Sequence, residues 1–339
     1  MSIQQTDVAI IGAGPVGLFA IFECGMMRLK CHVIDSLEMV GGQCTALYPE
    51  KPIYDIPGFP KISAEELIHN LKKQAEPFDP IYHLNQQVVN FKKNAAGLWR
   101  LEMSMGDVLE AKAILVAAGV GAFGPNRPPL EGLEDFEGRS VFYYVKNRQD
   151  FKNKKIVIAG GGDSAVDWAL SLSEIAQKVT VVHRRPKFRA APESESRLKK
   201  LADEGIIELA IPFQLEGISG QKGQLDTVIL KSLAGDIKEI SADILLPFYG
   251  LAMDLGPIAH WGLHLNTTHI QVDPKDCSTN IPGIYAIGDI ATYSHKLKLI
   301  LTGFAEAAHA AHAIRTFIHP GEVYHFEYST TSGVPSLAV

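Results

Sequence analysis

The chain has 339 residues, 46% of them hydrophobic and 21% charged, and its net charge is −6 at pH 7. This length suffices for two domains with substantial cores, and the composition is typical of a globular protein. The acidic balance argues against a basic nucleic-acid-binding protein, so we expect no nucleic-acid partner.

The chain begins with a predicted strand, turn, helix and second strand. Residues 8–11 suit a buried strand, residues 16–24 an apolar helix, and residues 31–34 another strand. This order is typical of the start of a parallel α/β domain. The apolar run over residues 8–22 lacks a basic segment before it and is interrupted by glycines, and no other run is as long as a membrane span. We therefore expect a cytoplasmic protein with no membrane partner.

The turn between this strand and helix carries a glycine motif. Gly12-Ala13-Gly14-Pro15-Val16-Gly17 has the spacing G-x-G-x-x-G, and Asp35 follows the second strand. The first glycine allows a tight turn, the second lets a pyrophosphate approach the backbone, and the third lets helix and strand pack closely. The helix N-terminus can bind the phosphates, and the Asp35 carboxylate can accept a hydrogen bond from a ribose hydroxyl. The motif predicts a bound dinucleotide; the alternative is a glycine-rich turn that serves packing only.

The middle of the chain is predicted to lead into a second domain. Residues 65–76 have the pattern of an amphipathic helix, and residues 99–103 and 108–117 alternate like antiparallel strands. The glycine-rich segment 119–125 suits a crossover, and the strand and turn at 244–250 suit the return. We expect one domain formed by residues 1–119 and 250–339, and another formed by residues 120–249.

The order strand, turn, helix, strand recurs in the second predicted domain. Residues 155–159 suit a strand, residues 160–162 a turn, residues 164–175 a helix, and residues 179–182 another strand. Two such segments predict two nucleotide sites. The fold class that follows is α/β, with two Rossmann-like (three-layer ββα) dinucleotide-binding domains.

The second glycine turn is followed by a basic segment. Its residues Gly160-Gly161-Gly162-Asp163-Ser164-Ala165 have alanine in the third glycine position, which the motif tolerates. The next strand ends in His183-Arg184-Arg185, with Arg189 close behind, and not in an acid. Guanidinium groups bind a 2′-phosphate, which an acid would repel. We predict that NADPH binds here through Gly160, Gly162, Asp163, Ser164, Ala165, His183, Arg184, Arg185 and Arg189; the alternative is a solvated basic loop.

Three further segments resemble the family of flavoproteins that hold two dinucleotides. Residues 279–289 resemble the late FAD motif of that family, whose aspartate, here Asp289, contacts the ribityl and phosphate region of the flavin. Residues 115–119 resemble the strand that leads into the NADPH domain, and Gly41-Gly42-Gln43 resembles the loop beside the flavin. The resemblance implies FAD in the first site, bound by Gly12, Gly14, Pro15, Gly17, Asp35, Gln43, Tyr48, Ala118 and Asp289.

The chain is similar to low-molecular-weight thioredoxin reductases, in which H-R-R-x-x-F-R-A follows the second glycine motif. Residues 183–190 match that pattern. Those enzymes carry a redox-active C-x-x-C pair before the motif, where this chain has Tyr143-Tyr144-Val145-Lys146. Without a dithiol, electrons cannot pass to thioredoxin by disulfide exchange. The chain therefore resembles the cysteine-free branch, the thioredoxin-reductase-like ferredoxin–NADP⁺ reductases.

One loop and one helix are expected to meet the flavin ring. Residues 41–51 resemble the loop of this branch whose tyrosine, here Tyr48, stacks on the isoalloxazine, and residues 54–60 continue the match. Thr302 is expected to open a helix over residues 303–314 and to contact FAD. The N-terminus of that helix would stabilise negative charge on the reduced flavin.

The C-terminal tail resembles another part of this branch. Residues 324–332 are similar to the segment that covers the other face of the flavin in the partner subunit. The resemblance implies a homodimer, with Tyr328 as the second stacking ring and Ser329 or Thr330 near the reactive N5 atom of FAD. Two other rings in the tail remain alternatives to Tyr328.

The resemblance implies hydride transfer from NADPH to FAD, followed by transfer of single electrons to ferredoxin or flavodoxin. Tyr48, Tyr328, Ser329 and Thr330 are expected to act at the flavin, while the cofactors supply the chemistry. Two alternatives remain. One is an NADPH-dependent flavin reductase for a separate dithiol protein or a quinone, and the other is a non-catalytic sensor that binds both cofactors.

Three other features are weaker signals. Cys44 lies near the predicted flavin, and as a lone cysteine it suits packing better than chemistry. His309 and His312 share a helix face without an acid between them, so we expect packing or surface residues and no metal site. The basic segment 295–298 suits either contact with an acidic electron carrier or a solvated loop.

Overall fold

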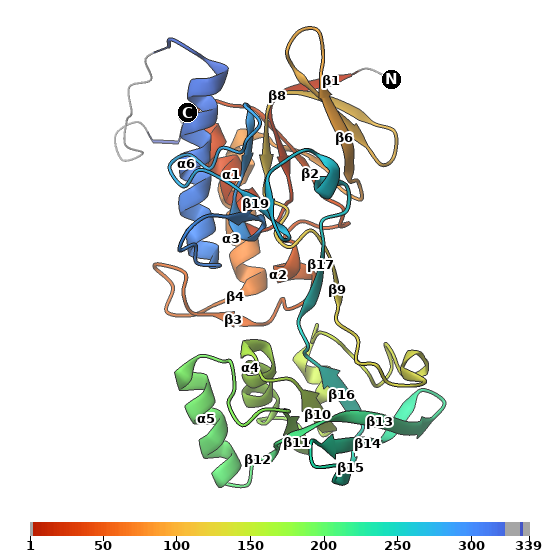
Figure 1. The fold of residues 1–339 in the computed structure, drawn as a ribbon. Coiled ribbons are helices and arrows are strands. Elements are labelled where there is room, and N and C mark those ends of the chain that lie inside the picture. The colour runs from red at the N-terminus through yellow and green to blue at the C-terminus, as the bar shows by residue number, and fades with distance from the viewer. Residues whose placement is uncertain (1–2, 323–332, 335–339) are drawn as a thin grey trace. The chain divides into compact units, whose positions relative to one another are not determined.

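The computed structural model describes residues 3–322 and 333–334, which form two compact units (Figure 1). Unit 1 contains the residues up to Phe123 together with those from Met253, and unit 2 contains Gly124–Ala252. The chain passes between the units along β9 (Ala122–Pro125) and β17 (Leu251–Asp254), which pair with each other. Unit 1 therefore combines segments from both parts of the chain.

A central sheet organises unit 1. Its strands are, in spatial order, β5 (Ile81–His83), β2 (Cys31–Ile34), β1 (Gln4–Ile11), β8 (Val108–Val116), β7 (Trp99–Met103) and β6 (Val88–Lys93), with β20 (Ile284–Ala286) also paired to β8. The strands β5, β2, β1, β8 and β20 are parallel, so their carboxyl ends lie at one edge of the sheet. β7 runs antiparallel to both β6 and β8, which confirms the predicted antiparallel pair. The glycine turn and Asp35 follow β1 and β2 at the shared edge.

Helices cover one face of this sheet. α1 (Pro15–Met26), α3 (Ala64–Ala75) and α6 (Ile300–Ile318) share a core with the strands. The hydroxyl of Ser63 accepts a hydrogen bond of 3.1 Å from the N–H of Glu66, a side-chain cap that fixes where α3 begins. Among the helices of the described residues, none has both the length and the apolar content needed to cross a bilayer.

The two faces of the sheet pack against different layers. Val8 and Ile10 of β1 point into the helix-side core, whereas Ala9 points to a second core with Trp99 and Trp261. This alternation gives three layers, as predicted for a ββα domain. The shorter elements of unit 1 are α2 (Gln43–Ala46), β3 (Pro52–Ile53), β4 (Ile62–Ser63), η1 (Glu76–Phe78), η4 (Gly256–His260), β18 (Leu265–Asn266), β19 (His269–Gln271), η5 (Gly288–Ile290) and β21 (Ala291–Thr292).

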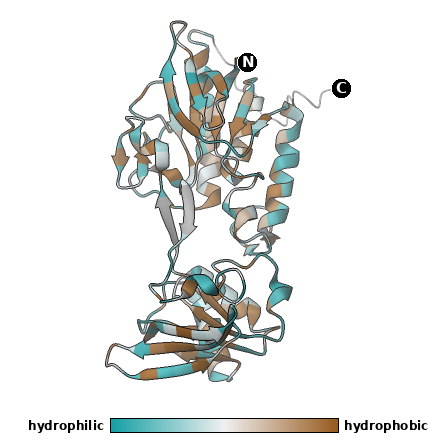
Figure 2. Cartoon of the chain, turned by 90° about the vertical axis from the view of Figure 1, so that its right-hand side faces the viewer, coloured by the Kyte–Doolittle hydropathy of each residue, from teal (hydrophilic) through white to brown (hydrophobic). Residues whose placement is uncertain are grey.

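Unit 2 repeats the architecture on a smaller scale. Its parallel sheet has the order β12 (Ile207–Ala210), β11 (Lys178–Val182), β10 (Lys155–Ala159) and β16 (Ile244–Pro247). An antiparallel sheet of β13 (Phe213–Gln221), β14 (Gln224–Ser232) and β15 (Ile237–Ser241) shares a core with it, and Figure 2 shows hydrophobic residues along these strands. The remaining elements are η2 (Leu133–Asp135), η3 (Arg148–Phe151), α4 (Asp163–Leu172) and α5 (Pro192–Asp203).

The helix α4 is shorter than predicted. It ends at Leu172, whereas the sequence pattern continues to Ile175. The hydroxyl of Ser173 donates a hydrogen bond of 2.8 Å to the carbonyl oxygen of Leu170. Such side-chain bonds to the backbone compete with continuation of the helix. Ile175 therefore lies in the turn that follows α4 and not in the helix.

Candidate cofactor sites

The three glycines of the first turn have different roles. Gly12 has a φ of +112°, and an added Cβ there would lie 2.3 Å from the carbonyl oxygen of Ala117. An added Cβ at Gly17 would lie 2.0 Å from the carbonyl oxygen of Gly12, so both glycines are required by packing. Gly14 is different, because a Cβ there would meet no protein atom within 4 Å. Packing therefore does not require glycine at Gly14, and the backbone there is open to the approach of a ligand.

The N-terminus of α1 adjoins this space. Gly14 is the N-cap residue, and no side chain caps the helix. Pro15 follows as the first helical residue, which leaves the next backbone N–H groups to find partners outside the helix. Uncapped N–H groups and the helix dipole together favour a bound anion such as a pyrophosphate.

A cavity of approximately 290 Å³ opens beside this turn in unit 1. Most of the residues predicted to bind FAD line it, namely Gly12, Gly14, Pro15, Asp35, Gln43, Tyr48, Ala118 and Asp289. They come from turns and loops far apart in the sequence, and the sheet brings them together at the carboxyl ends of its parallel strands. Gly17 is absent from the lining because it packs beneath the turn.

Two of the residues predicted to bind FAD, Thr302 and Thr330, are not among the described residues that line the cavity. α6 begins at Ile300, so the prediction that Thr302 opens this helix is wrong, and Leu299 and Ile300 line the cavity in its place. Thr330 lies outside the described residues, as do Tyr328 and Ser329.

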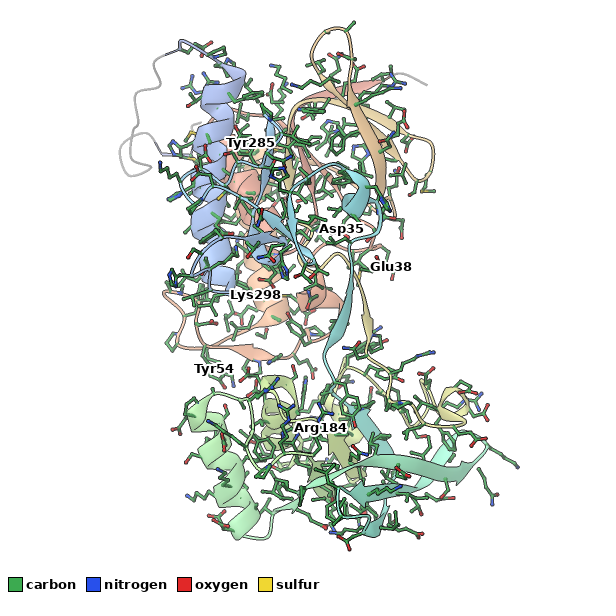
Figure 3. The ribbon with its side chains drawn as sticks, viewed as in Figure 1. Asp35, Glu38, Tyr54, Arg184, Tyr285 and Lys298 are labelled. Carbon is green, nitrogen blue, oxygen red and sulfur yellow. The ribbon has the colours of Figure 1, made fainter. Side chains whose placement is uncertain are left out.

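Asp35 braces the glycine turn. One carboxylate oxygen accepts a hydrogen bond of 2.6 Å from the N–H of Ala13, and the other accepts one of 2.8 Å from the N–H of Leu37. Burial raises the pKa of this carboxyl, and the two backbone bonds act against that shift. Each oxygen has a further lone pair, so Asp35 can hold the turn and still accept a bond from a ribose hydroxyl. Figure 3 labels Asp35 directly after β2.

Residues that no motif predicted also line the cavity. Gln86 belongs to the connection from β5 to β6, and Val88 is the first residue of β6. The N–H of Gln86 donates a bond of 3.0 Å to the carbonyl oxygen of Asp35. The side chain of Gln86 is buried, and its amide oxygen has no hydrogen-bond partner. The side-chain nitrogen of Gln86 donates a bond of 2.9 Å to the carboxylate of Asp107, which holds this side chain beside the cavity.

Tyr48 and Cys44 also line the cavity. α2 places Gln43 and Cys44 on the cavity, and Tyr48 follows after its end. Burial raises the pKa of the Cys44 thiol to about 11 and also raises the pKa of Tyr48. Both groups are therefore neutral at physiological pH. Cys44 is only 1% exposed, which fits a packing residue better than a nucleophile.

The thiols of this chain are expected to be unreactive in the folded protein. All four cysteines are free and buried, and burial raises the pKa of Cys277 to about 12. Because only the thiolate reacts, fewer than about one thiol per chain should react with Ellman's reagent at pH 8, against all four after denaturation. Rapid reaction of two thiols in the native protein, or their loss on oxidation, would instead indicate a redox pair.

The basic segment 295–298 is only partly a surface feature. The side chain of Lys296 is 5% exposed and forms an ion pair with the buried carboxylate of Glu306. Neither of the two predicted alternatives, contact with an acidic carrier or a solvated loop, fits the buried position of Lys296. Lys298, which Figure 3 labels, lines the cavity. Its Nζ atom lies 2.7 Å from a ring nitrogen of His269.

The second glycine turn lies in unit 2, between β10 and α4. Gly160 has a φ of +157°, and an added Cβ there would lie 2.6 Å from the carbonyl oxygen of Phe248. At Gly162, the N-cap of α4, an added Cβ would meet no protein atom within 4 Å. As in the first turn, one glycine, Gly160, is required by packing, and another, Gly162, borders open space.

The segment after β11 folds back onto this turn. The N–H of Arg189 donates a bond of 2.6 Å to the carbonyl oxygen of Gly161, and the N–H of Ala191 donates one of 2.8 Å to the carboxylate of Asp163. These bonds hold the basic segment beside the residues that would face a pyrophosphate. At the start of α4, Ala165 is buried and Ser164 is exposed.

His183 has a packing position within this segment. Its ring stacks on Phe188 with centroids 5.2 Å apart, and an added Cβ at Gly161 would lie 2.2 Å from it. Burial lowers the pKa of His183, and the nearby arginines lower it further, so the ring is neutral at pH 7. The side chains of Arg184, Arg185 and Arg189 are exposed and carry the charge of the segment. Figure 3 labels Arg184.

The two helix histidines show no ligand arrangement. His312 has a pKa that is lowered by burial and by the neighbouring His309. Within residues 3–322 and 333–334, no group of three or more histidine, cysteine, aspartate or glutamate side chains is placed to hold a metal ion.

Comparisons with known proteins agree with this architecture. A family model described as pyridine nucleotide-disulphide oxidoreductase matches residues 6–314. The chain is 60% identical over 335 residues to a ferredoxin–NADP reductase of Paramagnetospirillum magneticum, with 99% of each chain covered. It is 59% identical over 336 residues to a ferredoxin–NADP reductase of Rhodospirillum rubrum, covering 98% of this chain and 97% of the relative.

Solved structures of thioredoxin reductases share the fold. The enzyme of Lactococcus lactis superposes with a TM-score of 0.79 and 26% identity, covering 92% of this chain and 99% of that one. The enzyme of T. acidophilum gives a TM-score of 0.80 and 25% identity, covering 92% and 98%. The predicted class of two dinucleotide-binding domains is confirmed.

Proposed function

Because the chain belongs to the pyridine nucleotide-disulphide oxidoreductase family, we propose that it is an FAD-containing ferredoxin–NADP reductase. The observation that carries this proposal is the cavity of unit 1, which gathers the dinucleotide-binding residues around Tyr48 while its lone cysteine, Cys44, is buried and protonated. A family member without a dithiol at its flavin must pass electrons directly to a carrier.

The residues of the first cavity fit FAD. Gly14 and the uncapped N-terminus of α1 suit the pyrophosphate, and the Asp35 carboxylate suits a ribose hydroxyl. Asp289, in η5 after β20, suits the ribityl hydroxyls, and the ring of Tyr48 suits stacking on the isoalloxazine.

Unit 2 is suited to NADPH. Gly160 and Gly162 shape the turn, and α4 offers its uncapped N-terminus to the pyrophosphate. Asp163 holds the basic segment in place, while Arg184 and Arg185 suit the 2′-phosphate. The proposed division is therefore FAD in unit 1 and NADPH in unit 2.

FAD, when bound, accepts a hydride and releases single electrons. The chain's residues would orient and protect this chemistry without acting as acids or bases. Tyr48 is kept neutral by burial, so it offers an apolar face to the ring and adds no charge. The N-terminus of α6, at Leu299 and Ile300, would face developing negative charge with unpaired N–H groups.

The proposal extends to the assembly and to the carriers. Tyr328, Ser329 and Thr330 would cover the flavin of a partner subunit in a homodimer, as the resemblance of the tail implies. Flavodoxin would serve as an alternative carrier to ferredoxin, in the cytoplasm. Light scattering of the purified protein tests the dimer, since a monomer at micromolar concentration would remove this role for the tail.

Ferredoxin-dependent electron transfer is the expected activity. Purified yellow protein, mixed anaerobically with NADPH and ferredoxin, should reduce cytochrome c only when ferredoxin is present. Because the arginine segment suits the 2′-phosphate, the rate with NADPH should exceed that with NADH by at least about tenfold. Stopped-flow absorbance measures flavin reduction and carrier reduction separately.

Other outcomes would redirect the proposal. Flavin reduction without ferredoxin-dependent transfer, but with rapid reoxidation by a quinone or a separate dithiol protein, would identify a flavin reductase for that acceptor. Flavin reduction with no reoxidation by any carrier would favour a sensor. Protein that lacks bound FAD would contradict the assignment of the first cavity.

A further inference from the structure

A buried carboxylate lies behind the cavity of unit 1. Glu306 of α6 is 5% exposed, and its side chain accepts three hydrogen bonds. One oxygen accepts a bond of 2.7 Å from the N–H of Gly288, and the other accepts bonds from the hydroxyl of Tyr293, at 2.8 Å, and from the Nζ atom of Lys296. A buried carboxylate is retained only when its lone pairs are satisfied in this way.

Lys296 is committed to this carboxylate. Its side chain is 5% exposed, and its Nζ atom also lies 5.2 Å from the ring centroid of Tyr293. Burying such a pair costs desolvation that a pair of apolar side chains would avoid. A buried ion pair is therefore better explained by the geometry that it fixes than by stability.

The donors belong to two segments that line the cavity. Gly288 precedes Asp289, and both line the cavity directly. Lys296 precedes Lys298, Leu299 and Ile300, which line it from the start of α6. Glu306 itself is not a lining residue. Its carboxylate therefore has no direct contact with a ligand. It holds the backbone of Gly288, which lines the cavity, and the loop of Lys296, which leads into the start of α6.

Close packing makes the placement of these segments sensitive. An added Cβ at Gly303 would lie 2.4 Å from Val16, and one at Gly288 would lie 3.5 Å from the same side chain. Val16 belongs to the first glycine motif and lines the cavity. A displacement of the Gly288 turn or of α6 would therefore be transmitted to the pyrophosphate end of the site.

We propose that Glu306 is a positioning residue, which sets the Asp289 turn and the start of α6 in the arrangement that binds the flavin dinucleotide. This inference rests on the proposed function only for the identity of the ligand. We assign Lys296 to the same positioning role, as the cation that neutralises Glu306. Lys296 is then not part of a surface that binds an electron carrier.

The test removes the charges of Glu306 and Lys296, singly and together, and leaves the residues that line the cavity unchanged. Glu306→Gln keeps an acceptor but leaves Lys296 buried without a counter-charge, and Lys296→Met leaves Glu306 without its cation. The double variant removes both charges at nearly constant volume. The matched control is Glu322→Gln, which removes a carboxylate that is paired with Arg315 on the exposed far end of α6.

FAD binding is measured by titrating the full-length, FAD-free protein with FAD and following the quenching of FAD fluorescence. Each single variant should weaken binding by about tenfold, the effect of one lost hydrogen bond to a charged group, and the double variant should recover most of that loss. Bound FAD should show a shifted visible absorption maximum in Glu306→Gln. Glu322→Gln should bind FAD with unchanged affinity and spectrum.

The thermal unfolding of the FAD-free variants separates positioning from folding. Wild-type FAD affinity and spectrum in Glu306→Gln would overturn the proposal, as would a loss of FAD-free stability that accounts for the whole loss of binding. If Glu306→Gln does not fold, Lys296→Met and Tyr293→Phe decide, because each removes one donor and leaves the others. The readout does not involve ferredoxin, so a failed carrier assay leaves it interpretable.

Discussion

Replacing Arg184 and Arg185 together by alanine is expected to raise the KM for NADPH by about 100-fold and to leave the KM for NADH within about threefold. Both side chains are exposed at the end of β11, beside the second glycine turn. Each bond between a guanidinium and a phosphate contributes about 1.5–3 kcal/mol, and NADH has no 2′-phosphate to lose such bonds. Steady-state kinetics with both nucleotides and a single acceptor measures the ratio.

The control for this pair is Lys187→Ala, in the same segment. The Lys187 side chain is exposed, and only its backbone oxygen contacts His183. Its removal should change the KM for NADPH by less than about threefold. An equal rise in KM for NADPH and NADH in the arginine double variant would show that the segment had lost its fold on the turn, and would contradict a specific role in 2′-phosphate recognition.

The glycine motifs are predictable because their requirements are local. A turn between a strand and a helix needs glycine at Gly12 and Gly17, and the open space at Gly14 follows from the same spacing. Asp35 is distant in sequence, but parallel pairing of β1 with β2 brings it beside Ala13. A short motif together with one rule of sheet topology therefore predicts much of this site.

Other residues at or near the two sites depend on tertiary packing that no motif records. Glu306 is one acid in an alanine-rich helix, and its pairing with Lys296 depends on the path of the loop between them. Gln86 reaches the cavity only because its backbone bonds to Asp35. His183 is one of several basic residues in its segment, and only the fold places it against Gly161.

The start of α6 shows the limit of local signals in another way. Leu299 is the N-cap residue and makes no side-chain cap, so the sequence offers no capping signal there. Thr302 is the nearest residue of a capping type, and for that reason the predicted start falls too late. The helix begins earlier, where Leu299 and Ile300 line the cavity, and no local sequence signal marks that start.

Alanine at Gly14 and alanine at Gly17 are expected to fail in opposite ways. At Gly17 the new Cβ would lie 2.0 Å from the carbonyl oxygen of Gly12, a backbone atom that cannot rotate away. The free energy of unfolding of the FAD-free protein should fall by about 3 kcal/mol. Gly14 has a φ of −69°, which alanine adopts freely, and a Cβ there meets no protein atom. Its FAD-free stability should change by less than about 1 kcal/mol.

FAD affinity, unlike stability, is expected to be lowered by alanine at Gly14. In Gly14→Ala the Cβ would occupy the space that a pyrophosphate needs at the N-terminus of α1, so the Kd for FAD should rise by about 100-fold in a protein that is otherwise folded. Urea unfolding and FAD titration on the same preparations separate the two effects. Gly14→Ala protein that purifies with a full complement of FAD would contradict the assignment, because the open space at Gly14 would then need another explanation. Loss of stability and loss of FAD in equal measure in both variants would mean that the turn serves packing alone.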